Sequence, residues 1–207
     1  MKKLLLTGLL SLSTLQAANA NCIDMDGSWL IRVRGVGVIP AEKSSITPIG
    51  GSVKVSNTFV PEIDFSYFFN DNFSAELILA TTKHKMRAVN TAVGEVNVGS
   101  VWLLPPTLTF QYHFTQLDYF KPYAGVGINY TFFYHAKPGA LANVSYDNKA
   151  SLALQAGIDI PICNHVYLNF DVKKLFLKTT AAFNQETILA DVKLNPWLIG
   201  AGLGFRF

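Results

Sequence analysis

The feature that most constrains this chain is a strict alternation of apolar and polar residues in several short segments. In the segment 107–114 the two sets are Leu108, Phe110, Tyr112 and Phe114, and Thr107, Thr109, Gln111 and His113. Residues 152–160 and 197–207 repeat the pattern. A period of two residues is the period of a β-strand with two different faces. The alternation therefore predicts an all-β protein.

Composition excludes several other classes of protein. Of the 207 residues 50% are hydrophobic and 15% are charged, which excludes a disordered chain. After residue 20 no stretch approaches the roughly 18 apolar residues that a membrane-spanning helix needs. The formal net charge of +3 comes without concentrated Lys and Arg, so nucleic acid is not expected as a partner. The 4 histidines are scattered without metal-ligand spacing, and we expect neither a metal nor another cofactor.

The N-terminus has the three parts of a secretory signal peptide. Two lysines precede an apolar run over 4–15, and residues 18–20 form a small-residue cleavage site. We therefore expect a signal peptide over 1–20 and one domain over 21–207. A short buried helix is the alternative for this segment. Lipidation at Cys22 is disfavoured because the residue before it is not small.

Eight strands are expected in the mature chain. They are placed near residues 28–39, 58–69, 73–84, 106–116, 121–134, 150–161, 166–178 and 191–207. Short turns alternate with long connections, the long ones lying near 40–57, 85–105, 135–149 and 179–190. This layout on an even number of strands is typical of a bacterial outer-membrane barrel, and closure removes sheet edges that hydrocarbon does not tolerate. The predicted fold is an eight-stranded antiparallel transmembrane β-barrel with short periplasmic turns and longer extracellular loops.

A soluble lipocalin-like barrel is the main alternative, because it also has eight strands with alternating faces. The two folds differ in the face that points outward. Here the polar face is crowded with glycines and carries charges of both signs, which suits a narrow lumen. The other face is long aliphatic and aromatic, which suits lipid, and the last strand ends on Phe207. We therefore favour the membrane barrel.

Several motifs, which occur in the expected order, resemble the OmpW family of outer-membrane proteins. They are Asp71-Asn72 with Glu76-Leu77 and His84-Lys85, Leu104-Pro105-Pro106-Thr107-Leu108, Lys121-Pro122-Tyr123 through Gly125 and Gly127 to Thr131, and Asn195-Pro196-Trp197 through Gly202 and Gly204 to Phe207. The resemblance covers essentially the whole mature chain. It implies an outer-membrane barrel with a narrow hydrophobic channel for passive binding or passage of small apolar molecules, and no enzymatic activity.

The periplasmic half of the lumen is predicted to be charged. The residues expected to form an ion-paired network are Arg32, Arg34, Glu62, Asp64, Glu76, Asp159, Asp171, Lys173 and Arg206. A barrel of eight strands is filled by its own side chains. Each buried carboxylate needs a partner, because an unpaired buried charge is costly. We therefore expect a plug, with the three arginines paired to the carboxylates of Glu62, Asp64 and Glu76.

The extracellular half of the lumen is predicted to be apolar. Its channel-lining residues are Val36, Val38, Val60, Ile78, Leu175 and Leu198. Such a lining suits a receptacle for an apolar solute rather than an aqueous pore. On strand parity alone, a filled barrel with a structural or interaction function in its loops is an equal alternative. The resemblance favours the hydrophobic channel, with Ile78 and Leu198 as candidate constriction residues.

The expected partners follow from an outer-membrane location. They are outer-membrane lipid and lipopolysaccharide, the barrel-assembly machinery through the C-terminal strand, and small hydrophobic solutes. A monomer is expected. Lys83, Lys85 and Arg87 either meet lipopolysaccharide phosphates or are solvated rim charges. His113 lies near carboxylates, but no serine nucleophile convincingly shares its strand and layer, so a hydrolase is disfavoured.

The two cysteines are both expected at the periplasmic end of the barrel. Cys22 precedes the first strand, and Cys163 lies in the turn between the sixth and seventh strands. The periplasm permits disulfides. Two alternatives are equal for these residues. They form a disulfide with each other, or their thiols are free or linked between molecules.

Overall fold

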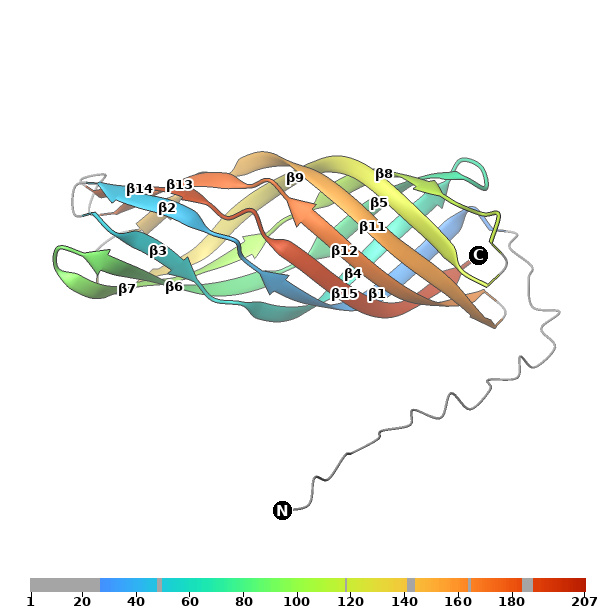
Figure 1. The fold of residues 1–207 in the computed structure, drawn as a ribbon, viewed down its shortest axis with the longest axis horizontal. Helices are drawn as coiled ribbons and strands as arrows, with labels where there is room; N and C mark the ends of the chain where they lie inside the picture. The colour runs from blue at the N-terminus through green and yellow to red at the C-terminus, as the bar shows by residue number, and fades with distance from the viewer. Residues whose placement is uncertain (1–26, 48–49, 118, 141–143, 164, 184–187) are drawn as a thin grey trace, which may run out of the picture.

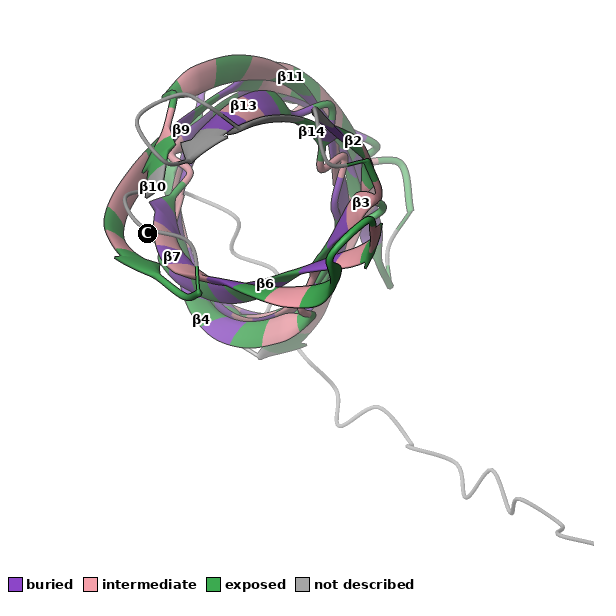
Figure 2. Ribbon diagram, turned by 90° about the vertical axis from the view of Figure 1, so that its left-hand side faces the viewer, coloured by how far each residue is buried: buried purple, intermediate pink, exposed green. Residues whose placement is uncertain are grey.

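The computed structural model describes residues 27–207 except 48–49, 118, 141–143, 164 and 184–187. The signal peptide expected over 1–20 and Cys22 lie outside the described residues. Figure 1 shows a cylinder of tilted strands, and the end-on view in Figure 2 shows that its wall is closed. No helix among the described residues is long and apolar enough to cross a membrane.

Eight strands form the closed barrel. They are β1 (Trp29–Ile39), β4 (Thr58–Phe68), β5 (Phe73–Ala80), β8 (Thr107–His113), β9 (Lys121–Pro138), β11 (Lys149–Cys163), β12 (Val166–Leu175) and β15 (Trp197–Arg206). All neighbouring pairs are antiparallel, and β15 pairs with β1 to close the ring. The eight-stranded antiparallel barrel predicted from the alternation is confirmed.

Seven further strands extend the wall at one end of the barrel, and we call them the upper tier. They are β2 (Lys43–Thr47), β3 (Ser52–Val55), β6 (Thr82–Thr91), β7 (Gly94–Leu104), β10 (Val144–Tyr146), β13 (Lys178–Phe183) and β14 (Ile188–Lys193). β10, β13, β14 and β2 form one sheet, while β3, β6 and β7 join the end of β9. The segments expected to be connections are therefore largely strands.

Prolines mark the boundary between the barrel and the upper tier. Pro40 follows β1, Pro105 and Pro106 lie between β7 and β8, and Pro196 precedes β15. Proline has no N–H group to donate to a strand ladder, so regular pairing is interrupted where it occurs. Pro40, Pro105 and Pro196 line one cavity, which places these interruptions at the same level of the wall.

The outward face of the barrel strands is a belt of exposed apolar side chains. It includes Val33, Ile63, Leu77, Leu108, Phe110, Val126, Ile128, Leu152, Leu154, Phe170, Ile199 and Leu203. Aromatic pairs border the belt, with Trp29 against Tyr67 at one end and Trp102 against Tyr134 at the other. An apolar belt between two aromatic girdles is the surface of a membrane barrel. A soluble barrel would turn its polar face outward.

The barrel ends differ in the length of their connections. At one end the Trp29 N–H donates to the Phe207 carbonyl and the Phe207 N–H to that of Trp29, which brings the first described strand and the C-terminus together. The connections there are short, such as 69–72 between β4 and β5. Short turns on the side of the termini are the periplasmic arrangement. We accordingly assign the upper tier to the cell exterior.

Candidate functional site: an apolar vestibule above an ion-paired plug

The periplasmic half of the lumen is filled by ion pairs centred on β1. The Arg32 guanidinium lies 3.2 Å from Asp64 Oδ1, 3.1 Å from Glu76 Oε1 and 2.7 Å from Asp159 Oδ2. Asp64 stands opposite Arg32 in the β1–β4 register, which accounts for the first contact. Arg32 and the carboxylates of Asp64 and Glu76 are fully buried. The resulting cluster is a plug without access to bulk water at its centre.

Arg34 and Lys173 extend the plug toward the exterior. The Arg34 guanidinium lies 2.9 Å from Glu62 Oε1, 2.6 Å from Asp64 Oδ2 and 3.1 Å from Glu76 Oε1. Lys173 Nζ lies 2.7 Å from both Glu62 Oε1 and Asp171 Oδ1. Each cation thus joins two or more carboxylates, so that the pairs form one network rather than separate bridges.

Neutral groups complete the coordination of the plug carboxylates. The side-chain amides of Gln111 and Gln155 donate to Glu76 Oε2 over 2.6 and 2.7 Å. The Tyr123 hydroxyl donates to Asp171 Oδ2 over 2.8 Å. Buried polar networks are stable only when their members are satisfied. These donors therefore allow the carboxylates to stay in a lumen that is closed to bulk water.

Arg206 is a correction to the predicted network. Among the described residues it makes no ion pair with Glu62, Asp64 or Glu76; its Nε donates to the Gly27 carbonyl over 2.8 Å, and its guanidinium lies 4.0 Å from the centre of the Phe68 ring. The reason is register, because Arg206 stands opposite Leu30 rather than Arg32 in the β1–β15 pair. It therefore belongs to the periplasmic mouth.

One glycine creates the space that the plug requires. A Cβ at Gly157 would lie 2.4 Å from the hydroxyl oxygen of Tyr123. The tyrosine ring therefore lies across the inner face of β11 at a position where any side chain would displace it. The polar face of the sequence is rich in glycine, and at Gly157 the missing side chain leaves room for the Tyr123 ring.

An apolar layer covers the plug on the exterior side. The six predicted channel-lining residues, Val36, Val38, Val60, Ile78, Leu175 and Leu198, are all buried and line one small cavity. Glu62 and Lys173 from the plug line the same cavity, so the layer and the plug are in direct succession. The empty space in this layer is about 370 Å³, including any open solvent. It is the narrow part of the lumen above the plug.

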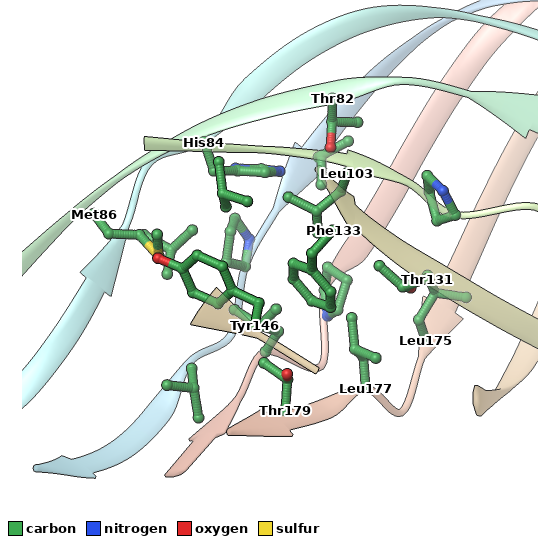
Figure 3. Close-up of a pocket in the computed structure, with 18 of the residues that line it drawn as sticks. Thr82, His84, Met86, Leu103, Thr131, Phe133, Tyr146, Leu175, Leu177 and Thr179 are labelled. Carbon is green, nitrogen blue, oxygen red and sulfur yellow. The ribbon is translucent and has the colours of Figure 1, made fainter. Parts of the chain in front are cut away.

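A larger apolar cavity, which we call the vestibule, lies above this layer within the upper tier (Figure 3). It contains about 790 Å³ of space free of protein atoms, part of it open solvent. Its lining includes Val53, Met86, Val101, Leu103, Phe133, Tyr146, Leu175, Leu177, Val192 and Leu198. Mostly apolar walls with a few polar groups are typical of sites for small molecules. The vestibule has the surface of such a site.

The few polar groups of the vestibule are neutral and bonded to the protein. His84 Nδ1 lies 2.7 Å from the Ser56 carbonyl oxygen, which assigns the ring proton to this nitrogen. Burial lowers the pKa of His84, so the imidazole is uncharged at pH 7. Burial also raises the pKa of Tyr146, whose hydroxyl lies 3.7 Å from Met86 Sδ. The wall therefore offers little to a hydrated or charged solute.

Sequence reasoning missed most of the vestibule wall. Val53, Val101, Phe133 and Tyr146 lie on strands of the upper tier or on adjoining strands, and three of them fall within or beside segments read as connections. The available signal was the alternation in 82–88, where His84, Met86 and Ala88 are buried and the residues between them are exposed. That alternation continues the pattern of the barrel strands.

Comparison with known proteins identifies the family to which the chain belongs. A sequence model of the OmpW family matches residues 25–207. An uncharacterized outer-membrane protein, y4mB of Sinorhizobium fredii, is 47% identical over 184 residues, covering 86% of this chain and 80% of that protein. The dibenzothiophene metabolism operon protein PahQ of Pseudomonas aeruginosa is 30% identical over 163 residues, with 76% of each chain covered.

A solved structure shows the same fold. The crystal structure of the outer membrane protein OprG from Pseudomonas aeruginosa superposes with a TM-score of 0.81 at 25% identity, covering 87% of this chain and 96% of that one. The family match, the barrel and its apolar belt together place the chain in the bacterial outer membrane as a non-enzymatic barrel. The protein belongs to the OmpW family.

Proposed function

We propose that this barrel binds small apolar molecules in its vestibule and lets them pass passively through the outer membrane. The observation that carries the proposal is the almost wholly apolar wall of the vestibule at the outer end of the lumen. Burial of apolar surface is favourable by roughly 25 cal/mol per Å². A solute of matching size gains this free energy without paying for an unsatisfied polar group.

Aromatic side chains in the vestibule favour flat apolar solutes. The rings of Phe133 and Tyr146 stack with centres 5.5 Å apart and planes inclined by 20°, and Met86 lies beside Tyr146. Aromatic rings and the polarisable thioether both make favourable contacts with other rings. PahQ, a relative named for a dibenzothiophene operon, agrees with this class of solute.

The plug gives the proposed channel its selectivity against water and ions. Its arginines and carboxylates occupy the lumen below the apolar layer and are already paired with one another. An ion entering this region would have to replace such pairs, whereas an apolar solute in the vestibule contacts the apolar walls above them. A purely structural barrel with a filled lumen is the alternative, and the vestibule argues against it.

Ile78→Asp tests the proposal with Ile78→Val as the matched control. Ile78 is buried in the apolar layer, so an aspartate there puts a charge into an apolar wall. We expect the aspartate variant to lose uptake of a fluorescent naphthylamine into vesicles, while the valine variant keeps it. Wild-type uptake by Ile78→Asp would remove this residue from the path. No uptake by the wild-type protein would favour the filled barrel.

We also propose partners for the barrel. The protein is embedded in outer-membrane lipid, and we propose contact with lipopolysaccharide and recognition of the C-terminal strand by the barrel-assembly machinery. Trp197, Phe205 and Phe207 of that strand region are exposed on the outer face, which supports the second contact. A monomer is proposed because the closed ring leaves no barrel strand edge to pair with another chain.

A further inference from the structure

A groove on the outer wall of the upper tier has no role in the proposed channel. It is lined by residues of β3, β6, β7 and β9, namely Lys54, Val55, Ser56, Lys85, Met86, Arg87, Asn97, Gly99, Ser100, Lys137, Pro138 and Gly139. It holds about 1240 Å³ of space, part of it open solvent. We propose that this groove binds a phosphate group of lipid A, the anchor of lipopolysaccharide in the outer leaflet.

The charge of the groove is the first argument. Lys54, Lys85, Arg87 and Lys137 are all exposed at its rim. Lys54 Nζ lies 3.4 Å from Glu42 Oε1, which compensates one charge. Among the residues that the structure describes, the other three make no ion pair, and Glu95 at the nearby hairpin is exposed without one. The groove therefore has an excess of positive charge.

The register of the strands concentrates this charge. Lys54 stands directly opposite Arg87 in the β3–β6 pair, although like charges in that position repel each other. Lys85 is two residues from Arg87, and Lys137 stands opposite Ser100, which itself stands opposite Lys85. The directly opposite positions are about 5 Å apart, and the other neighbouring positions are about 7–10 Å apart along or across the strands. An anion with several oxygens can bridge them and remove the repulsion.

The floor of the groove is backbone, which gives it depth. Gly99 has φ of +115°, and a Cβ there would lie 2.1 Å from the Lys137 carbonyl oxygen. A Cβ at Gly139 would lie 2.2 Å from the Asn97 carbonyl oxygen. Pairing shifts register between Met86 and Arg87 at the same level. The glycines thus let β7 and β9 approach closely below a rim of long cationic side chains.

The height of the groove matches that of lipid phosphates. Lys83 Nζ lies 5.6 Å from the centre of the Trp102 ring, within the outer aromatic girdle. Lys83 pairs with Trp102 and Lys85 with Ser100, so the groove begins two residues, or about 7 Å, beyond the girdle. Below it the exposed side chains of Leu104 and Phe132 offer apolar surface for acyl chains. The outer leaflet of the outer membrane presents the phosphates of lipid A at this level.

Arg87 and the lysines supply the chemistry that phosphate recognition needs. Guanidinium groups bind phosphate through two parallel hydrogen bonds, and ammonium groups bind it as point charges. The hydroxyls of Ser56 and Ser100 and the amide of Asn97 in the groove lining are further donors. Among the described residues, none of those that line the groove carries a carboxylate.

The test compares two charge-removing variants of the full-length barrel in nanodiscs. The double variant Lys85→Gln/Arg87→Gln removes two positive charges from the groove. Lys178→Gln with Lys193→Gln removes two exposed cations from a row in the β13–β14 pair, which does not line the groove. With fluorescent lipid A as the probe, we expect the groove variant to bind about a hundredfold more weakly, because two charge-assisted bonds are lost and each costs roughly tenfold. The control should stay within about twofold of wild type.

Three results would overturn the proposal. An equal loss in the control variant would show general attraction by the cationic wall. Equal wild-type affinity for dephosphorylated lipid A would exclude phosphate recognition, and displacement of lipid A by equimolar inorganic phosphate would indicate an anion site without lipid specificity. Naphthylamine uptake is measured in the same samples. The inference depends on the outer-membrane location but not on the channel. A groove variant that keeps wild-type uptake while it binds lipid A more weakly would therefore show that the groove and the channel are separate sites.

Discussion

Replacing Glu76 by glutamine tests whether the plug is held by charge. The substitution keeps the shape of the side chain and removes its charge. Glu76 Oε1 lies 3.1 Å from both Arg32 Nη1 and Arg34 Nη2, while Oε2 accepts the amides of Gln111 and Gln155. These four partners are all donors, whereas an amide has one oxygen and one donor nitrogen.

Both orientations of the new amide are unfavourable. If its oxygen faces the two arginines, its NH₂ group meets the NH₂ groups of Gln111 and Gln155. If it is flipped, the NH₂ group faces two guanidinium groups. Either way at least two hydrogen bonds to a charged group are lost, each worth about 1.5–3 kcal/mol. We expect a loss of about 3–5 kcal/mol, the range for breaking a buried ion pair.

The assay is urea unfolding in lipid vesicles, followed by tryptophan fluorescence, together with ion conductance in planar bilayers. Asp147→Asn is the matched control, because Asp147 pairs with Lys149 over 3.3 Å with both side chains exposed. Exposed pairs contribute about 0–1 kcal/mol. Glu76→Gln should lower the midpoint and raise ion leakage, and the control should do neither. If the two variants behaved alike, the plug would not depend on its charges.

Three further outcomes are expected from other parts of the chain. Gly157→Ala should displace the Tyr123 ring and cost about 1–3 kcal/mol in the same unfolding assay, since its Cβ would lie 2.4 Å from the hydroxyl; full wild-type stability would show that the ring moves freely. Because burial lowers the pKa of His84, stability and apolar binding should be complete above about pH 6.5 and fall below it. His84→Phe should flatten that dependence, and an unchanged pH profile would exclude His84 as its source. A Cys22–Cys163 disulfide predicts no reactive thiol in unreduced, unfolded protein and a stabilisation of about 4–5 kcal/mol, whereas two reactive thiols per chain would exclude it.

The barrel strands were predictable because alternate residues of a membrane-barrel strand face lipid and lumen, so that apolar and polar side chains alternate in the sequence. Segment 107–114 shows this most clearly, and β8 runs from Thr107 to His113. The upper tier was harder to predict, because several of its strands are short, as in β3 and β10. Interruptions such as Pro105-Pro106 then read as the start of long loops.

Parity predicted which residues enter the lumen but not which of them meet. Arg32 and Arg34 were expected to pair with the carboxylates of Glu62, Asp64 and Glu76, and in the structure they contact these carboxylates. Arg206 has the same parity, yet it lies one layer lower because its partner in the register is Leu30. The contact between Arg32 and Asp159 crosses the lumen between strands that are not neighbours. Contacts across a lumen depend on tilt and closure, which a linear pattern does not encode.

The wall formed by β3 and β6 separates the two proposed sites. Val53 on β3 lines the vestibule and not the groove, whereas Lys85 on the neighbouring strand β6 lines the groove and not the vestibule. Val53→Ser should weaken naphthylamine uptake and leave lipid A binding within about twofold, while Lys85→Ser should do the reverse, because substitutions without shared partners act independently. Parallel losses in both assays would mean that either change disturbs the wall itself, and the assignment of separate sites to its two faces would fail.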